Sequence, residues 1–222
     1  HTNTSVGQNT LQALTTGHTN VAVGGASGYS ITTGHTNVFI GSAVGNATTI
    51  NNSIGIGNDA MGAVPSGQAV EYAIAIGVNA MKGSGSTTNG INGNIAIGGE
   101  AGLLLTTGGN NTLIGYATAD ELLTGSNNTT LGRHSLGNAD GDEDDNTCIG
   151  YLAGTSIDNG NNNTLLGSQT DVSTATATNQ TVVGYATTGV ADNSVTLGNA
   201  DVTKVYIAPG NTSGQTIIFK DG

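Results

Sequence analysis

The residues with side chains suited to chemistry are few in this chain of 222 residues and fall into small groups. The densest is an acidic run in which Asp140, Asp142 and Asp144 alternate with other residues. Alternating carboxylates can bind Ca²⁺, but Asp145 stands where an EF-hand loop requires glycine. A solvated acidic loop that improves solubility is the simpler interpretation. We therefore expect no cofactor, and Ca²⁺ at this run is the alternative.

Two histidines form the second group. His18 and His35 lie 17 residues apart in the repeated phrase Thr-Thr-Gly-His-Thr-Asn. If the repeats stack, the two imidazoles would be close enough to share a metal ion. Because no third ligand recurs nearby, an exposed polar corner is the alternative interpretation.

Three tyrosines recur at one place in the repeat. Tyr116, Tyr151 and Tyr185 each follow directly after a recurring glycine. Stacked on one edge, they could form an aromatic strip that contacts sugar rings of a receptor. Ordinary half-exposed strand tyrosines explain the pattern equally well.

The two longest repeats supply further candidate receptor contacts. Their extra residues surround Ser66 and run from Lys82 past Ser86. Insertions in repeat proteins become surface loops, which often carry the binding face.

The sequence gives little support for a catalytic arrangement of side chains. No Gly-x-Ser-x-Gly elbow appears in a strand-to-helix context, and Cys148 falls inside an expected strand. Asp120, Glu121 and Glu100 could supply paired carboxylates, but nothing in the sequence places two of them about 5–9 Å apart for glycan cleavage. We expect that the protein is not an enzyme.

Composition narrows the class further. The chain has 37 Gly, only 4% aromatic residues and a net charge of −11. Because its four Lys and Arg are scattered, we expect no nucleic-acid binding. The sequence has no stretch of 18 apolar residues, so we also expect no membrane insertion. With His1 first and no Met or signal segment, the chain is expected to be a processed part of a longer protein.

The elements that position these residues come from an internal repeat. Twelve glycines serve as anchors, spaced mostly 16–18 residues apart: Gly7, Gly24, Gly41, Gly57, Gly77, Gly98, Gly115, Gly132, Gly150, Gly167, Gly184 and Gly198. The residue before each anchor (position −1) is Val, Ile or Leu, and position −3 is β-branched. Position −4 is Asn in eight repeats: Asn3, Asn20, Asn37, Asn94, Asn111, Asn128, Asn146 and Asn163.

These columns predict an all-β fold, a parallel β-roll or β-solenoid of about 12 coils. Positions −3 and −1 share one face of a strand, the glycine ends it, and the Asn column forms a hydrogen-bonded ladder. A helical alternative fails because each Gly costs about 1 kcal/mol in a helix interior. Since rows −3 and −1 cannot be the sole core of so Gly-rich a chain, we expect apolar burial between chains in a homotrimer.

The repeat resembles two related families. Segments such as Ala73-Ile-Ala-Ile-Gly-Val-Asn-Ala80 look like head repeats of YadA-like trimeric autotransporter adhesins. The longer unit, residues 3–17, is closer to repeats of phage and prophage tail-fibre proteins, and residues 193–207 resemble the segment that often closes such a fibre. This resemblance implies a left-handed, trimeric β-roll used for surface display and host attachment.

The resulting expectation is a repeat domain at 1–198, followed by a closing or neck segment at 199–222 that leads to a further C-terminal region. We expect a non-enzymatic fibre shaft or head of a viral tail fibre, located on the virion tail or otherwise extracellular at a cell surface. Its partners would be its own copies and a host-surface glycan or protein. A bacterial trimeric adhesin is the alternative, and a polysaccharide-degrading solenoid enzyme is a third hypothesis.

Overall fold

The structure is a computed structural model that describes residues 2–64, 69–84 and 91–205. Within these residues the secondary structure consists of short parallel strands and turns, with no helix. The fourteen strands are β1 (Thr4–Val6), β2 (Val21–Val23), β3 (Val38–Ile40), β4 (Thr49–Asn51), β5 (Ile54–Ile56), β6 (Ala69–Glu71), β7 (Ile74–Ile76), β8 (Ile95–Ile97), β9 (Thr112–Ile114), β10 (Thr129–Leu131), β11 (Thr147–Ile149), β12 (Thr164–Leu166), β13 (Thr181–Val183) and β14 (Val195–Leu197).

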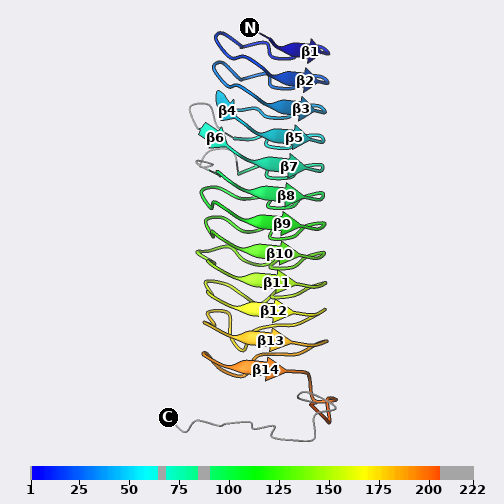
Figure 1. Cartoon of the computed structure of the whole chain (residues 1–222), viewed down its shortest axis with the longest axis vertical. Helices are drawn as coiled ribbons and strands as arrows, with labels where there is room; N and C mark the ends of the chain where they lie inside the picture. Colours follow the sequence, from blue (N-terminus) through cyan, green and yellow to red (C-terminus); the bar gives the residue numbers. More distant parts are fainter. Residues whose placement is uncertain (1, 65–68, 85–90, 206–222) are drawn as a thin grey trace, which may run out of the picture.

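Twelve of these strands form one sheet that runs the length of the molecule (Figure 1). They pair in parallel and in sequence order, with each strand directly in register with the next. The other two strands, β4 and β6, pair with each other in a small second sheet. The β-solenoid that the repeats predict is therefore confirmed. About twelve coils were expected, and the twelve stacked strands are joined by eleven turns of the solenoid.

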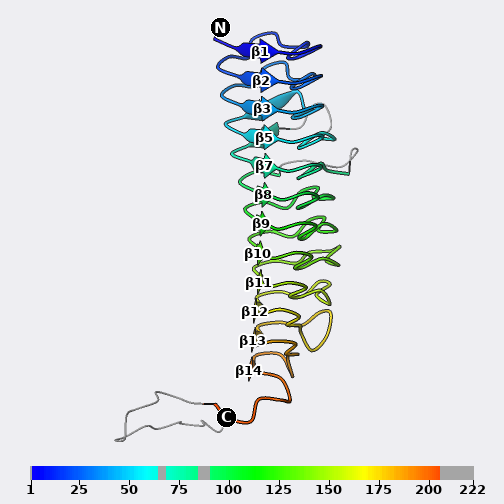
Figure 2. The ribbon, with the colours of Figure 1, turned by 90° about the vertical axis from the view of Figure 1, so that its right-hand side faces the viewer.

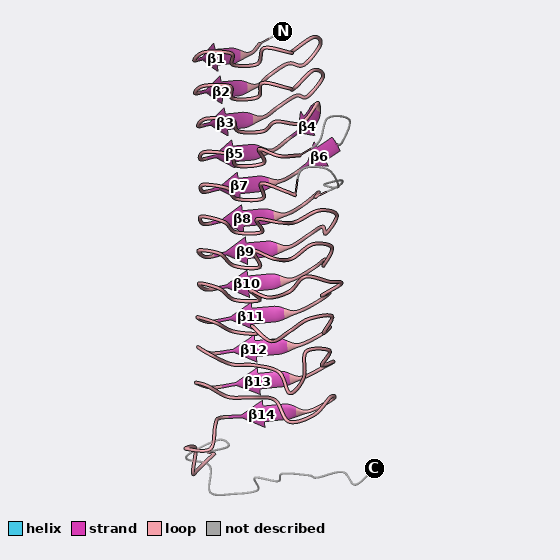
Figure 3. Ribbon diagram, turned by 180° about the vertical axis from the view of Figure 1, so that it is seen from behind, coloured by secondary structure: helices cyan, strands magenta, loops and turns pink. Residues whose placement is uncertain are grey.

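The strands stack along one side of the column, and the turns and return segments fill the other side (Figures 2 and 3). The middle residue of each strand, position −2, points into the coil, and from β2 to β13 every one of these residues outside β4 and β6 is buried. Positions −3 and −1, which carry the uniform aliphatic and β-branched columns, face outward. Leu131 and Leu166, for example, are 48% and 47% exposed.

In two neighbouring coils the side chains at positions −2 and +4 have complementary sizes. Phe39 fills the interior of its coil, and Gly45 opposite it has no room for a side chain, because a Cβ there would lie 2.5 Å from the Phe39 ring. In the next coil the sizes are reversed, since Gly55 stands at −2 and the buried Met61 stands at +4. The core is thus filled by complementary pairs rather than by one repeated residue.

The anchor glycines sit where consecutive coils touch. Gly41 has a φ of +137° and a Cβ at this position would lie 2.5 Å from the carbonyl oxygen of Gly57. From Gly7 to Gly167, a Cβ at each anchor would clash with the carbonyl oxygen of the next anchor, which explains why glycine follows these strands of the long sheet.

The predicted Asn ladder is confirmed. Oδ1 of Asn20 accepts hydrogen bonds from the backbone N–H of Asn37 at 3.1 Å and from its side-chain amide at 2.9 Å. The Asn20 amide in turn donates to the carbonyl oxygen of Gly34 at 2.9 Å. Each Asn therefore satisfies buried polar groups of the coil beside it.

Candidate functional site

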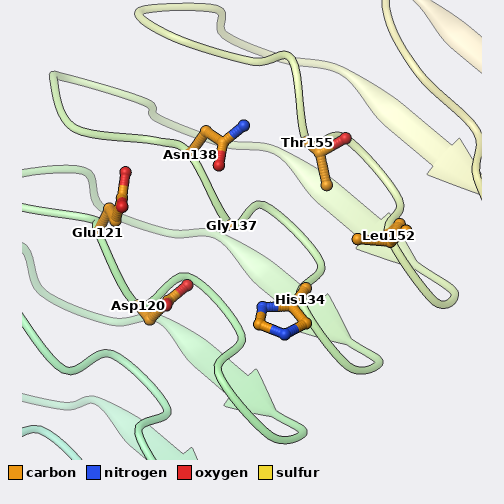
Figure 4. Close-up of a pocket in the computed structure, with 7 residues that line it drawn as sticks. All are labelled: Asp120, Glu121, His134, Gly137, Asn138, Leu152 and Thr155. Carbon is orange, nitrogen blue, oxygen red and sulfur yellow. The ribbon is translucent and has the colours of Figure 1, made fainter.

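A hollow opens on the return side of the column, across three successive coils (Figure 4). Its volume is about 470 Å³ and it is lined by Asp120, Glu121, His134, Gly137, Asn138, Leu152 and Thr155. We call it the Gly137 hollow.

Three of the residues that line the hollow belong to one column of the repeat. Asp120, Gly137 and Thr155 each stand five residues after an anchor, so they occupy the same place in neighbouring coils. A Cβ on Gly137 would lie 3.2 Å from the His134 carbonyl oxygen and 3.7 Å from Asp120 Oδ1. Gly137 carries no side chain between Asp120 and Thr155, and Asp120, His134 and Asn138 lie around this place (Figure 4).

Asp120 is a partly buried carboxyl group of the hollow. Its Oδ1 is covered from solvent and has no hydrogen-bond partner among the described residues. Burial raises the pKa of Asp120, whereas its own backbone N–H and the nearby His134 act to lower it. The sequence offers Asp120 and Glu121 as carboxylates without placing them in space, and the fold brings both to the wall of one hollow.

Beside the hollow, the expected tyrosine strip takes a different form. The guanidinium carbon of Arg133 lies 5.9 Å from the ring centre of Tyr116 on one side and 5.9 Å from that of Tyr151 on the other. Arg133 follows its anchor as the tyrosines do, so the row reads Tyr–Arg–Tyr over three coils and is held by cation–π contacts. Tyr185 stands two coils further on, with Ser168 between, and is 67% exposed.

Tyr116 also connects this row to the hollow. Its ring packs edge-on against His134, with centroids 5.8 Å apart and planes at 89°. The carboxylate of Glu100 hydrogen-bonds to the Tyr116 hydroxyl and raises its pKa. The phenol O–H is thus donated to the Glu100 carboxylate, and the phenol oxygen can accept a hydrogen bond at the rim.

The two repeat histidines are stacked as the phasing predicts. The His18 and His35 rings are parallel within 6°, and their centroids are 5.2 Å apart. A metal ion shared by the two rings would lie about 2.1 Å from one nitrogen of each. Those two nitrogens could then be no more than about 4.2 Å apart. In this arrangement the rings form a stacked polar corner, and each Nδ1 hydrogen-bonds to the following Thr.

The acidic run directs its side chains to different places. Asp142 accepts a hydrogen bond from the Thr124 hydroxyl at 2.5 Å, and Asp144 Oδ1 accepts one from the Ser126 N–H at 2.7 Å. Asp140 is exposed, and Glu143 between them is fully buried. Among the described residues, no group of three His, Cys, Asp or Glu side chains converges as a metal site.

The loop candidates are placed only in part. Ser66 and Ser86 lie outside the described residues. Lys82 is described, and its ammonium group forms an ion pair with Asp59 at 3.3 Å. Cys148, set aside as a packing residue, is buried inside the coil, and burial raises the pKa of its thiol to about 12.

The described residues contain no helix that is long and apolar enough to cross a membrane. No protein-family model matches the chain, and no curated protein or solved structure is significantly similar to it.

Proposed function

We propose that the chain is a non-enzymatic shaft or head of a homotrimeric fibre, most consistent with a viral tail fibre that projects or attaches to a receptor on a host cell. One observation carries the proposal: the twelve strands form a single in-register column whose outward face bears an unbroken aliphatic row. Such a column is a rigid spacer, since every coil is hydrogen-bonded to the next along its length.

The outward aliphatic row supports association with copies of the same chain. Position −1 is Val, Ile or Leu in all twelve repeats, although these side chains face away from the coil interior. Several of them are half-exposed in the single chain, among them Val6, Ile40, Leu131, Leu166 and Leu197. A continuous apolar stripe of this length marks an interface. The regular spacing favours a partner with the same repeat, because only an identical column matches it coil for coil.

Three copies are the stoichiometry that we propose, on the resemblance to trimeric tail fibres and adhesin heads. Each copy would turn its strand side toward the common axis and its return side toward solvent. The left-handed winding that the resemblance implies belongs to the same proposal.

The association is tested by measuring the mass in solution by light scattering. We expect three times the chain mass of 21.8 kDa for the parent protein. The double variant Leu131→Asp with Leu166→Asp should give a monomer with an unchanged circular dichroism spectrum, because both side chains lie outside the coil. Thr176→Asp, at an exposed position of the return side, is the matched control and should remain trimeric. A monomeric parent protein would contradict the proposal.

Attachment is tested by adding fluorescently labelled protein to a panel of bacterial cells. Saturable adsorption to some strains and not to others supports a receptor-binding fibre, and adsorption to none contradicts it. A bacterial trimeric adhesin with the same column remains the second candidate. Neighbouring baseplate genes would favour the viral fibre, whereas an encoded translocator barrel downstream would favour the adhesin.

A further inference from the structure

We propose that the Gly137 hollow is a binding site for a neutral, hydroxyl-rich saccharide unit. This inference rests on the proposed attachment role for its biological meaning, and it adds the place of contact and the class of ligand.

The shape of the hollow is the first argument. Gly137 carries no side chain between Asp120 and Thr155 of the neighbouring coils. The volume of the hollow, about 470 Å³, falls within the range of small-ligand sites. The surrounding backbone is held by coil-to-coil hydrogen bonds, including those from the Leu136 N–H to Ala153 and from the Leu152 N–H to Arg133. The site is therefore formed before any ligand arrives.

The chemistry of the walls is the second argument. Asp120 and Glu121 offer carboxylate acceptors, Asn138 offers both donors and an acceptor, and Thr155 offers a hydroxyl. Leu152 gives an apolar surface on one side. Sugars present alternating hydroxyl groups around a ring whose C–H faces are apolar, which matches this mixture of groups.

Charge selects among saccharides. The hollow is lined by two carboxylates and by no Lys or Arg, and the chain as a whole carries a net charge of −11. Acidic sugars would be repelled by this surface. The neighbouring guanidinium of Arg133 is already engaged by the two tyrosine rings. Between neutral and acidic saccharides, the walls therefore favour a neutral hexose or N-acetylhexosamine.

Tyr116 extends the site at its rim. Its ring is half-exposed and packs edge-on against His134, which itself lines the hollow. An exposed aromatic face next to a polar hollow suits the stacking of a second sugar ring. The site thus fits the end of an oligosaccharide better than an isolated monosaccharide.

The position of the hollow leaves it free in the proposed trimer. It lies among the turns and return segments in front of the strands in Figure 4, and the strands occupy the opposite side of the column from these segments in Figure 2. Association through the outward aliphatic row would leave the hollow open to solvent.

The test is calorimetric titration of the purified protein with methyl glycosides of glucose, galactose, mannose and N-acetylglucosamine and with short oligosaccharides of each. We expect at least one saturable neutral ligand. Gly137→Leu should weaken it by about tenfold or more because the new side chain fills the hollow, and Asp120→Asn should weaken it similarly by replacing a charged acceptor. Gly25→Leu and Asp140→Asn are the matched controls at exposed positions and should bind as the parent does.

The proposal is overturned if no member of the panel binds, or if Gly137→Leu binds as tightly as the parent while its circular dichroism spectrum is unchanged. Heat from Ca²⁺ alone, without heat from any sugar, also overturns it. The attachment role fails separately: a parent protein that binds sugar but adsorbs to no cell would leave the site standing and remove its proposed use. Loss of both sugar binding and cell adsorption in Gly137→Leu would support the two proposals together.

Discussion

Oδ1 of Asn128 accepts two hydrogen bonds from Asn146 in the next coil, one from the backbone N–H at 3.0 Å and one from the side-chain amide at 3.2 Å. The Asn128 amide also donates to Asn111 Oδ1 at 3.1 Å and to the Glu143 carbonyl oxygen at 2.5 Å. All four residues are fully buried. One side chain therefore joins three consecutive coils.

Asn128→Ala should destabilise the protein by about 2–4 kcal/mol, because it leaves the Asn146 N–H and the Glu143 carbonyl group buried without partners. The measurement is urea unfolding followed by circular dichroism. Asn138→Ala, at an exposed position, is the control and should change stability by less than about 0.5 kcal/mol. Equal stability of the two variants would contradict the ladder.

Replacement of an anchor glycine should be among the most damaging single changes. Gly132 has a φ of +147°, and an added Cβ would lie 2.6 Å from the carbonyl carbon of Gly150. We expect Gly132→Ala to cost about 3 kcal/mol or more, from backbone strain and the steric clash together. Gly25→Ala has open space and no positive φ, so its melting temperature should match that of the parent. A small effect at Gly132 would show that the coils can separate locally.

Asp120 should make stability depend on pH in a defined direction. Burial raises the pKa of its carboxyl group above the ordinary value of 3.8, so the folded chain holds this proton more tightly than the unfolded chain does. Its stabilising contribution is fully present below pH 3.8 and is lost as pH rises through the folded pKa. Asp120→Asn should therefore melt at a higher temperature than the parent at pH 7, and the difference should disappear below pH 3.8. A lower melting temperature at pH 7 would contradict this.

The Cys148 thiol should be unreactive until the column opens. It is buried and its pKa is raised to about 12, so almost none of it is thiolate at pH 8. We expect an aromatic disulfide reagent to label it at the rate of unfolding in native buffer and at once in strong denaturant. Fast labelling of the folded protein would place Cys148 in a mobile or accessible segment.

Candidate ligand contacts were harder to predict than the fold. The phase of the repeat brings His18 beside His35 and puts Tyr116 and Tyr151 in one row, as expected. Arg133 is not predicted in that row from the recurrence of tyrosine, because it shares only the position and not the residue type. The signal was present, since Arg133 also follows an anchor glycine directly.

The interior was harder still to assign. The −3 and −1 positions, where residue types recur most regularly, predict the strands but face outward. The −2 position, where the residue type varies, forms the core. Phe39 and Gly55 at −2 do not resemble each other because Gly45 and Met61 compensate for them across the coil. The positions at which the same residue types recur therefore lie on the outer face of the strands, which no residue of the same coil covers.

The sequence by itself determined the coil length, the parallel register, the anchor glycines and the Asn ladder. These features follow from like residues recurring at one spacing, and such residues can satisfy their backbone and amide groups only by stacking on themselves. The tertiary structure alone decided which strand face is inside and where the surface is hollow. Alternation along a strand defines two faces without saying which is enclosed, and the Gly137 hollow is lined by residues from three coils that are far apart in the sequence.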